Sequence, residues 1–435
     1  MARLQSFTLE DFRSYKEGIL KLGPLTLLVG ANASGKSNLI EGLQMLSWLA
    51  QGKRLEDVFR AVQEAEMSIR GQPTDLARDG ETSFSFACKI LSIWGTLQLC
   101  VTIKNNGSGL RITKERVTVD GANAPFYEVR RGTNHAGHDL QVAYNNFSRG
   151  GKKPQIICTD EQAVFTQLLT PARFNASHKR AQEELPKMCK VFMSSLRQIL
   201  ILDPLPQQMR VSSFYDDKLL RGDGSNLSGA LFSLYLNAKS KAAVLDFIKD
   251  LPEQHITDIQ FHHGTRNDVL VQLEETFGSK KRWRDATLLS DGTLRVLAVA
   301  AALLSVPEHS TVVMEEIDNG IHPSRANALL VNVQKIAKKR KLAVLITSHN
   351  PALLDALPDS AVPDVVFCYR DPEEGDSRLV RLEDLPNYPE LVARGPLGRL
   401  VTQGVLDRMV KQSQTEEERR KTGLRYVAEL KKTQP

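Results

Sequence analysis

The residues best suited to chemistry form a glycine-rich segment near the N-terminus, Gly30-Ala31-Asn32-Ala33-Ser34-Gly35-Lys36-Ser37. It follows an apolar run at 25–29 and precedes a stretch, 38–49, in which leucines recur with helical spacing. Glycines in a strand-to-helix turn let backbone N–H groups point inward and bind an anion at the helix N-terminus. The pattern GxxxxGK[ST] adds a lysine for the β- and γ-phosphates and a hydroxyl for Mg²⁺. We therefore predict a site for ATP in which Lys36 contacts phosphate, Ser37 contacts the metal, and the nucleotide is lined by Gly30, Asn32, Ala33, Ser34, Gly35, Lys36, Ser37 and Asn38.

Two adjacent carboxylates, Glu315 and Glu316, directly follow the apolar residues 312–314. Such a run is typical of a buried strand, and acids at its C-terminal end lie where open α/β sheets bind ligands. One carboxylate can hold hydrated Mg²⁺, and a second can orient the attacking water. We predict that Glu315 faces the metal and that Glu316 is the catalytic carboxylate.

Leu289-Ser290-Asp291-Gly292-Thr293 precedes a long apolar helix. Read alone, it is a helix N-cap, but in its place between the glycine-rich segment and the paired acids it resembles the ABC signature of SMC-like, RecF-like and OLD-type ATPases. The resemblance implies that Ser290 and Gly292 contact ATP held by a second subunit. Residues 318–322 stand where ABC proteins carry the D-loop. Thr347-Ser348-His349-Asn350 follows another apolar run and resembles the switch region, which implies that His349 hydrogen-bonds the γ-phosphate.

Phe12-Arg13-Ser14-Tyr15 resembles an N-terminal turn of RecF and SMC heads, which implies that Arg13 lies near the nucleotide. A purely structural turn is the alternative. The family's Q-loop glutamine has no clear counterpart. Residues 200–204 and 223–227 resemble elements of standalone OLD/RecF-like ATPases, and the sequence shows no TOPRIM-like acidic constellation after the head.

Apolar runs that alternate with helical patterns after residue 288 predict a mostly parallel α/β sheet. Helices are expected at 292–304, 324–338 and 351–357, and strands at 4–9, 18–22, 25–29, 311–314, 342–346 and 365–369. Between them, strands are expected at 82–90, 96–104, 258–262 and 269–273, helices at 179–200, 227–238 and 241–250, and a glycine-rich loop at 130–153. The middle region has no heptad repeat, which argues against a coiled-coil arm.

These patterns predict an α/β protein: an ABC-type P-loop ATPase head with a mixed sheet, interrupted by an α+β insertion. Residues 1–51 and 288–390 would form the two halves of the head. Residues 52–287 would form the insertion, one part completing the head and another serving as a docking or lid region. Residues 391–435 would form a C-terminal helical tail.

Composition bounds the function further. The net charge is +6, and five scattered cysteines without a CxxC pair argue against a disulfide framework or a zinc site. No apolar run approaches the roughly 20 residues that span a bilayer, so we expect a cytoplasmic protein with no membrane contact. His135 and His138 lack further metal ligands. The basic run 280–284, which contains Trp283, is the better candidate for nucleic-acid contact, because the run 338–341 ends a helix whose dipole favours cations.

Together these features predict an ABC-type switch that hydrolyses ATP with Mg²⁺ and forms a homodimer, or a higher homo-oligomer, through its heads. The resemblance implies a sensor or regulator of a separate effector, with a nuclease as one candidate, in an antiphage defence or toxin system. A RecF-like DNA-binding repair or clamp ATPase is the alternative, which the basic runs favour. Glu316 disfavours a third hypothesis, a scaffold that binds ATP and barely hydrolyses it.

Overall fold

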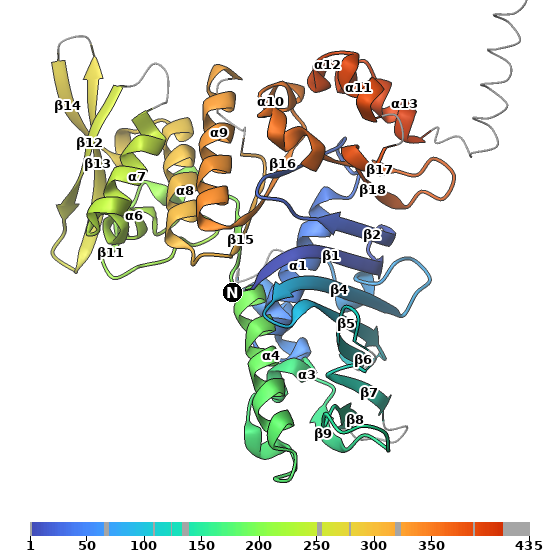
Figure 1. Cartoon of the computed structure of the whole chain (residues 1–435). Coiled ribbons are helices and arrows are strands. Elements are labelled where there is room, and N and C mark those ends of the chain that lie inside the picture. Colours follow the sequence, from blue (N-terminus) through green and yellow to red (C-terminus); the bar gives the residue numbers. More distant parts are fainter. Residues whose placement is uncertain are drawn as a thin grey trace, which may run out of the picture.

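The computed structural model describes residues 2–64, 69–107, 109–122, 124–132, 139–249, 255–277, 280–317, 323–385 and 388–411. Within them, the strands form three sheets, of which the central one is mostly parallel and the other two are antiparallel (Figure 1). The α/β fold class with a mixed sheet is thereby confirmed.

The central sheet has the order β10-β15-β16-β3-β17-β18. Its first five strands are mutually parallel, and β18 is antiparallel to β17. Successive residues of β3 and β15 enter two different cores, because side chains alternate between the faces of a strand. This double burial explains the uninterrupted apolar runs in the sequence. The strands are β10 (Ile199–Leu202), β15 (Thr311–Met314), β16 (Ala343–Ser348), β3 (Thr26–Val29), β17 (Val366–Arg370) and β18 (Ser377–Arg381).

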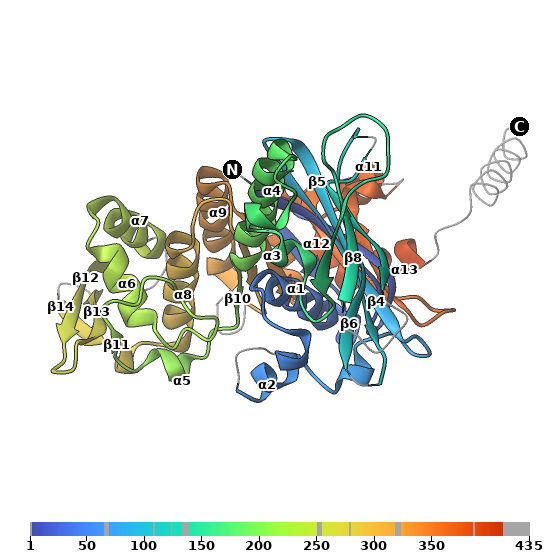
Figure 2. The same cartoon turned by 90° about the horizontal axis from the view of Figure 1, so that it is seen from below.

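One face of the central sheet packs with helices α1 (Lys36–Ala50) and α4 (Lys179–Arg197) into a core shared with the eight-stranded antiparallel sheet (Figure 2). This second sheet joins the N-terminal strands to the middle of the chain in the order β2-β1-β4-β5-β6-β7-β8-β9. Its strands are β2 (Tyr15–Lys21), β1 (Arg3–Phe12), β4 (Ser83–Ser92), β5 (Gly95–Asn105), β6 (Leu110–Val119), β7 (Tyr127–Gly132), β8 (Asp139–Tyr144) and β9 (Gln155–Thr159). The short helices α2 (Val58–Gln63) and α3 (Val164–Gln167) belong to the same part of the chain.

The other face of the central sheet packs against helices from the last third of the chain and from a lateral lobe. The lobe lies at the left of Figure 1, and its small sheet, made of β11 to β14, forms the outer edge of the molecule there. The helices from the last third are α8 (Asp291–Ser305), α9 (Pro323–Arg340), α10 (Pro351–Asp355), α11 (Tyr388–Ala393), α12 (Leu397–Thr402) and α13 (Val405–Lys411). The lobe adds α5 (Pro206–Met209), β11 (Ser213–Phe214), α6 (Leu227–Tyr235), α7 (Ala238–Lys249), β12 (His255–His263), β13 (Asp268–Phe277) and β14 (Lys280–Asp285).

Most elements predicted from periodicity are confirmed within a few residues, but two predictions were wrong. The helix expected at 179–200 ends at Arg197, and Ile199–Leu202 form β10 because they pair in parallel with β15. The loop expected at 130–153 contains β8 and the end of β7, which pair with each other. Both strands depend on partners elsewhere in the chain, which local composition does not reveal. Within the described residues, no helix is both long and apolar enough to cross a membrane.

Candidate functional site

The glycine-rich segment connects β3 to α1 in a turn that tolerates no side chain at two positions. A Cβ atom on Gly30 would collide with the backbone oxygen of Cys368. Gly35 has φ of 118°, and a Cβ there would collide with the hydroxyl of Ser377. Glycine is therefore required at both positions, once by close backbone approach and once by both conformation and space.

Neighbouring strands hold the turn from behind. The hydroxyl of Tyr15 donates to Gly35 O at 3.1 Å, and Ser377 Oγ donates to Ser34 O at 2.6 Å. On the outer side, Arg370 Nε donates to the backbone oxygen of Ala33 at 3.0 Å. Asn32 and Ala33 remain exposed at the front. The turn is thus held by β2 and by the hairpin of β17 and β18, two segments that are far apart in sequence.

Lys36 lies inside the curve of the turn. Its Nζ donates to Gly30 O at 2.7 Å and to Ala31 O at 3.0 Å, and burial lowers its pKa. Ser37 is exposed and lines one end of a cavity. Asn38 Nδ2 donates a hydrogen bond to Ser14 Oγ at 2.7 Å. Lys36 and Ser37 are therefore placed where a phosphate and its metal could reach them. The side chain of Asn38 is instead hydrogen-bonded to Ser14.

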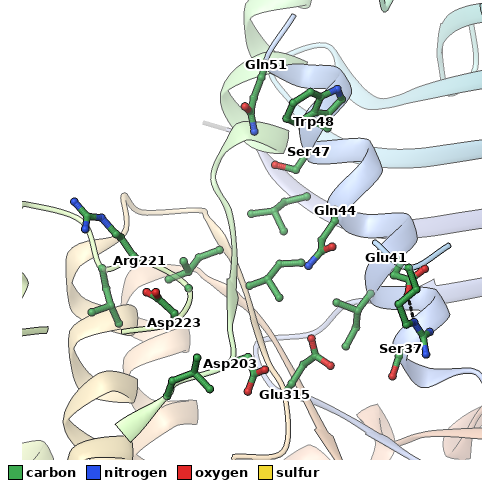
Figure 3. A pocket seen from close by; sticks show the side chains of 18 of the residues that line it. Ser37, Glu41, Gln44, Ser47, Trp48, Gln51, Asp203, Arg221, Asp223 and Glu315 are labelled. Carbon is green, nitrogen blue, oxygen red and sulfur yellow. Dashed lines mark hydrogen bonds and ion pairs between the residues drawn. The ribbon is translucent and has the colours of Figure 1, made fainter. Parts of the chain in front are cut away.

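The cavity has a volume of about 1010 Å³ and extends along α1 between this helix, β10 and the segment around residues 203–223 (Figure 3). Ser37 and Glu315 both line it, although they lie 278 positions apart in the sequence. Figure 3 shows that Gln44 and Ser47 project into it from α1 and that Arg221 and Asp223 belong to the segment on its opposite side.

Glu315 follows β15 at the C-terminal edge of the central sheet. Its backbone N–H donates to Leu202 O at 3.0 Å, which continues the pairing of β15 with β10. The pKa of its carboxyl is raised to about 7, first by burial and then by the nearby carboxylates of Asp203 and Glu316. The edge therefore concentrates negative charge, which a cation would offset.

Glu316 and His349 lie together at the same edge. Glu316 has φ of 45°, and its backbone N–H donates to Thr347 Oγ1 at 3.2 Å. Its Oε1 lies 3.6 Å from His349 Nδ1, and both side chains are roughly half exposed. A left-handed backbone at a glutamate is strained and persists because the surroundings hold it. The carboxylate of Glu316 and the imidazole of His349 therefore reach solvent side by side after the adjacent strands β15 and β16.

Ser290 and Gly292 lie elsewhere, at the start of α8. Ser290 Oγ caps the helix by accepting from Thr293 N at 3.2 Å. Arg210 braces this end by donating to Leu289 O at 3.0 Å and to Asp291 Oδ1 at 2.6 Å. Neither Ser290 nor Gly292 lines the cavity that contains Ser37. The expected D-loop, 318–322, and His135 and His138 lie outside the described residues.

The interactions of Arg13 favour the structural alternative for this residue. Its guanidinium forms an ion pair with Glu41 at 2.9 Å and donates to the backbone oxygens of Asp75, at 2.9 Å, and Arg70. Its side chain is only 12% exposed. In contrast, the side chain of Arg70 is 65% exposed, and it lines the cavity while its Nε holds Glu41 at 2.5 Å. Arg70 was missed because an isolated arginine outside any motif carries no sequence signal.

Asp203 was also missed. It follows β10 and lines the cavity beside Glu315. An acid after the apolar run 199–202 repeats the pattern of the run that precedes Glu315, and this signal was available in the sequence. The signal was overlooked because the start of the run 199–202 was predicted to belong to the helix at 179–200.

The basic run 280–284 forms β14 on one side of the lateral sheet. Two of its cations are paired with acids of the neighbouring strand β13: Lys281 with Glu274 at 3.0 Å and Arg284 with Glu275 at 2.8 Å. These pairs reduce the charge that the strand presents to a polyanion such as DNA.

The residues at this edge fit a nucleoside triphosphate with Mg²⁺. The two glycines allow the backbone N–H groups of the turn to face an anion, and Lys36 supplies a positive charge beside them. Ser34 Oγ is buried and has no hydrogen-bond partner among the described residues. Ser37 and Glu315 add a hydroxyl and a carboxylate, the oxygen ligands that Mg²⁺ prefers.

Comparisons with known proteins give short matches to relatives and broad but low-scoring matches to structures. A DNA replication and repair protein RecF of Gloeobacter violaceus is 46% identical over 70 residues, 16% of this chain and 17% of that protein. The RecF protein of Acaryochloris marina is 32% identical over 105 residues, 24% of each chain. The matches thus span about a quarter or less of these relatives. The SMC head domain of Thermotoga maritima has a TM-score of 0.44 at 13% identity and covers 87% of this chain and 98% of that one.

A family model covers far more of the chain than these relatives do. It is described as "AAA domain, putative AbiEii toxin, Type IV TA system" and matches residues 25–83 and 131–355. Because these ranges make up more than half of the chain, the protein belongs to this family of AAA-type ATPase domains.

Proposed function

We propose that this chain binds ATP together with Mg²⁺ at the C-terminal edge of its central sheet and hydrolyses it there. The observation that carries the proposal is the convergence of Ser37 and Glu315 on one cavity beside the glycine-rich turn. The pairing of Glu316 with His349 at the same edge supports hydrolysis rather than binding alone.

Each residue of the site has a distinct role in this proposal. Lys36 leaves its backbone acceptors and binds the β- and γ-phosphates, while the N–H groups of the turn hold the phosphate oxygens. Ser37 and Glu315 would hold the metal, which would supply charge neutralisation at the phosphates. Glu316 orients the attacking water, and His349 donates to the terminal phosphate.

A second copy of the chain completes the site. Ser290 and Gly292 begin a helix and therefore offer unpaired backbone N–H groups to an anion. Since they do not line the cavity of their own chain, they serve the nucleotide of a partner copy in an isologous dimer. ATP then joins two heads, and hydrolysis releases them.

The switch regulates a separate effector in a defence or toxin system. The family description, which names a putative toxin of a type IV toxin–antitoxin system, supports the toxin-system context and does not mention an effector. The alternative, a RecF-like DNA-binding ATPase, gains support from the short RecF matches and loses some from the ion pairs of β14. DNA affinity with a steep dependence on salt concentration would favour the alternative.

Two substitutions test the ATPase. Lys36→Ala removes the phosphate-binding cation and is expected to weaken ATP binding measured by calorimetry. Glu316→Gln is expected to retain ATP affinity and lose turnover measured by phosphate release. A Glu316→Gln protein that hydrolyses ATP at the wild-type rate would show that another group orients the water.

A further inference from the structure

Asp203 occupies the same position after β10 that Glu315 occupies after the neighbouring strand β15. The two strands are parallel, Leu202 pairs with Met314, and Glu315 N donates to Leu202 O at 3.0 Å. Residues that follow neighbouring parallel strands emerge at the same edge of the sheet. Both acids line the cavity that also contains Ser37, and Figure 3 shows their carboxylates side by side.

The two carboxylates form an electrostatically unfavourable pair. In the described part of the chain, no side-chain hydrogen bond or ion pair engages the carboxylate of Asp203. Arg70 also lines the cavity, but its guanidinium pairs with Glu41. Two acids that face a cavity without a cation between them are suited to share a divalent ion.

The backbone of Asp203 is fixed rather than mobile. Its N–H donates to Gly222 O at 2.9 Å, and Leu205 N donates to Asp223 O at 2.9 Å. Gly222 packs so closely against the backbone oxygen of Ile201 that a side chain there would collide with it. Asp203 is therefore held at the edge of the sheet by two consecutive bonds, which is the support that a metal ligand needs.

We propose that Asp203 is a third metal-facing residue, which together with Ser37 and Glu315 holds the Mg²⁺ that accompanies ATP. The proposal rests on the ATP site described above. Oxygen ligands of mixed type on three different elements suit the octahedral preference of Mg²⁺, which also retains water and phosphate ligands.

The test measures metal affinity rather than turnover. The full-length Glu316→Gln protein, saturated with ATP, is titrated with Mn²⁺ as a paramagnetic probe, and free Mn²⁺ is followed by electron paramagnetic resonance. Adding Asp203→Asn is expected to raise the dissociation constant for Mn²⁺ about tenfold. Asp203→Glu, which keeps the charge, is expected to restore most of the affinity. Binding of ATP without divalent metal is expected to stay unchanged in both.

Asp223→Asn is the matched control. Asp223 lines the same cavity, but its Oδ1 accepts from Ser225 N at 2.9 Å within the following turn. The substitution removes the same charge and is expected to leave Mn²⁺ affinity within about twofold of the parent protein, because this carboxylate is engaged within its own turn. Equal losses in Asp203→Asn and Asp223→Asn would show a general effect of cavity charge and overturn the proposal.

Two further results separate this proposal from the ATP site on which it rests. If Glu315→Gln loses Mn²⁺ affinity while Asp203→Asn keeps it, Asp203 is not a metal-facing residue and the ATP site stands. If Lys36→Ala binds ATP as tightly as the parent protein, the ATP site itself is wrong. Thermal unfolding of each variant identifies a folding defect. If Asp203→Asn does not fold, Asp203→Ser takes its place in the titration with the same expected loss, and Mn²⁺ affinity equal to that of the parent protein overturns the proposal.

Discussion

Glu41 Oε1 accepts from Arg70 Nε at 2.5 Å, while Glu41 Oε2 pairs with Arg13 at 2.9 Å. One carboxylate on α1 thereby holds two arginines in different surroundings. Arg13 is enclosed, whereas Arg70 extends over the cavity that contains Ser37. The arginine expected near the nucleotide thus braces the one that is open to the cavity.

Arg13→Ala and Arg70→Ala should therefore separate stability from ATP binding. Removing Arg13 leaves Glu41 buried with one partner fewer and is expected to cost about 3 kcal/mol of unfolding free energy. Removing the exposed Arg70 is expected to cost at most about 1 kcal/mol and to weaken ATP binding. Urea unfolding and calorimetric titration of both variants measure the two effects. An Arg13→Ala protein of normal stability with reduced ATP affinity would instead support a direct nucleotide contact.

Mixing two inactive variants tests the composite site. Ser290→Arg blocks the start of α8, and Lys36→Ala disables the glycine-rich turn. In a mixed dimer, one site carries both defects and the other carries none, so mixing is expected to restore ATP hydrolysis that neither variant shows alone. Phosphate release is measured before and after mixing, with each variant mixed with itself as the control. Failure of any ratio to restore activity would indicate that each chain builds its own complete site.

Gly30→Ala tests the close approach of two strands behind the nucleotide. The added methyl group would collide with the backbone oxygen of Cys368, so the turn must shift away from β17. We expect ATP affinity to fall at least about tenfold, equivalent to about 1.4 kcal/mol. Gly107→Ala, at a hairpin position with positive φ and open space, is the control for strain without collision. Equal ATP affinity in the two variants would rule out the steric explanation.

Glu115 should make the stability of the fold depend on pH. It is buried and accepts from Tyr127 Oη at 2.5 Å, Val164 N at 2.7 Å and Phe165 N at 2.8 Å. Burial outweighs these bonds and raises its pKa from 4.5 to about 7. The folded state therefore binds more protons between these values, so the stabilisation is present below about pH 4.5 and is lost as pH rises to about 7.

Glu115→Gln should remove this dependence. Between pH 5 and 8, the wild-type protein is expected to lose up to about 3 kcal/mol relative to the variant, an upper bound set by the size of the pKa shift. The absolute stability of the variant is expected to be lower, because its amide N–H₂ faces a backbone donor. Urea unfolding at several pH values compares the slopes. Parallel curves for the two proteins would show that Glu115 does not titrate in this range.

The sequence by itself determined the glycine-rich turn, the paired acids after an apolar run and the helix cap at Ser290. These features are local: each is a contiguous pattern whose geometry follows from a strand end or a helix start. The order of the motifs along the chain and their resemblance to ABC ATPases indicated which elements had to meet. The α/β class followed from the alternation of apolar runs with helical patterns.

Only the tertiary structure decided which residues surround those motifs. Ile199–Leu202 form a strand because β15 lies beside them, and this pairing places Asp203 next to Glu315 across more than a hundred residues of sequence. Arg13 and Arg70 both pair with Glu41, but only Arg13 is enclosed, where it also donates to the backbone oxygens of Asp75 and Arg70. Such arrangements depend on contacts between distant segments, whose energies are invisible in a local pattern.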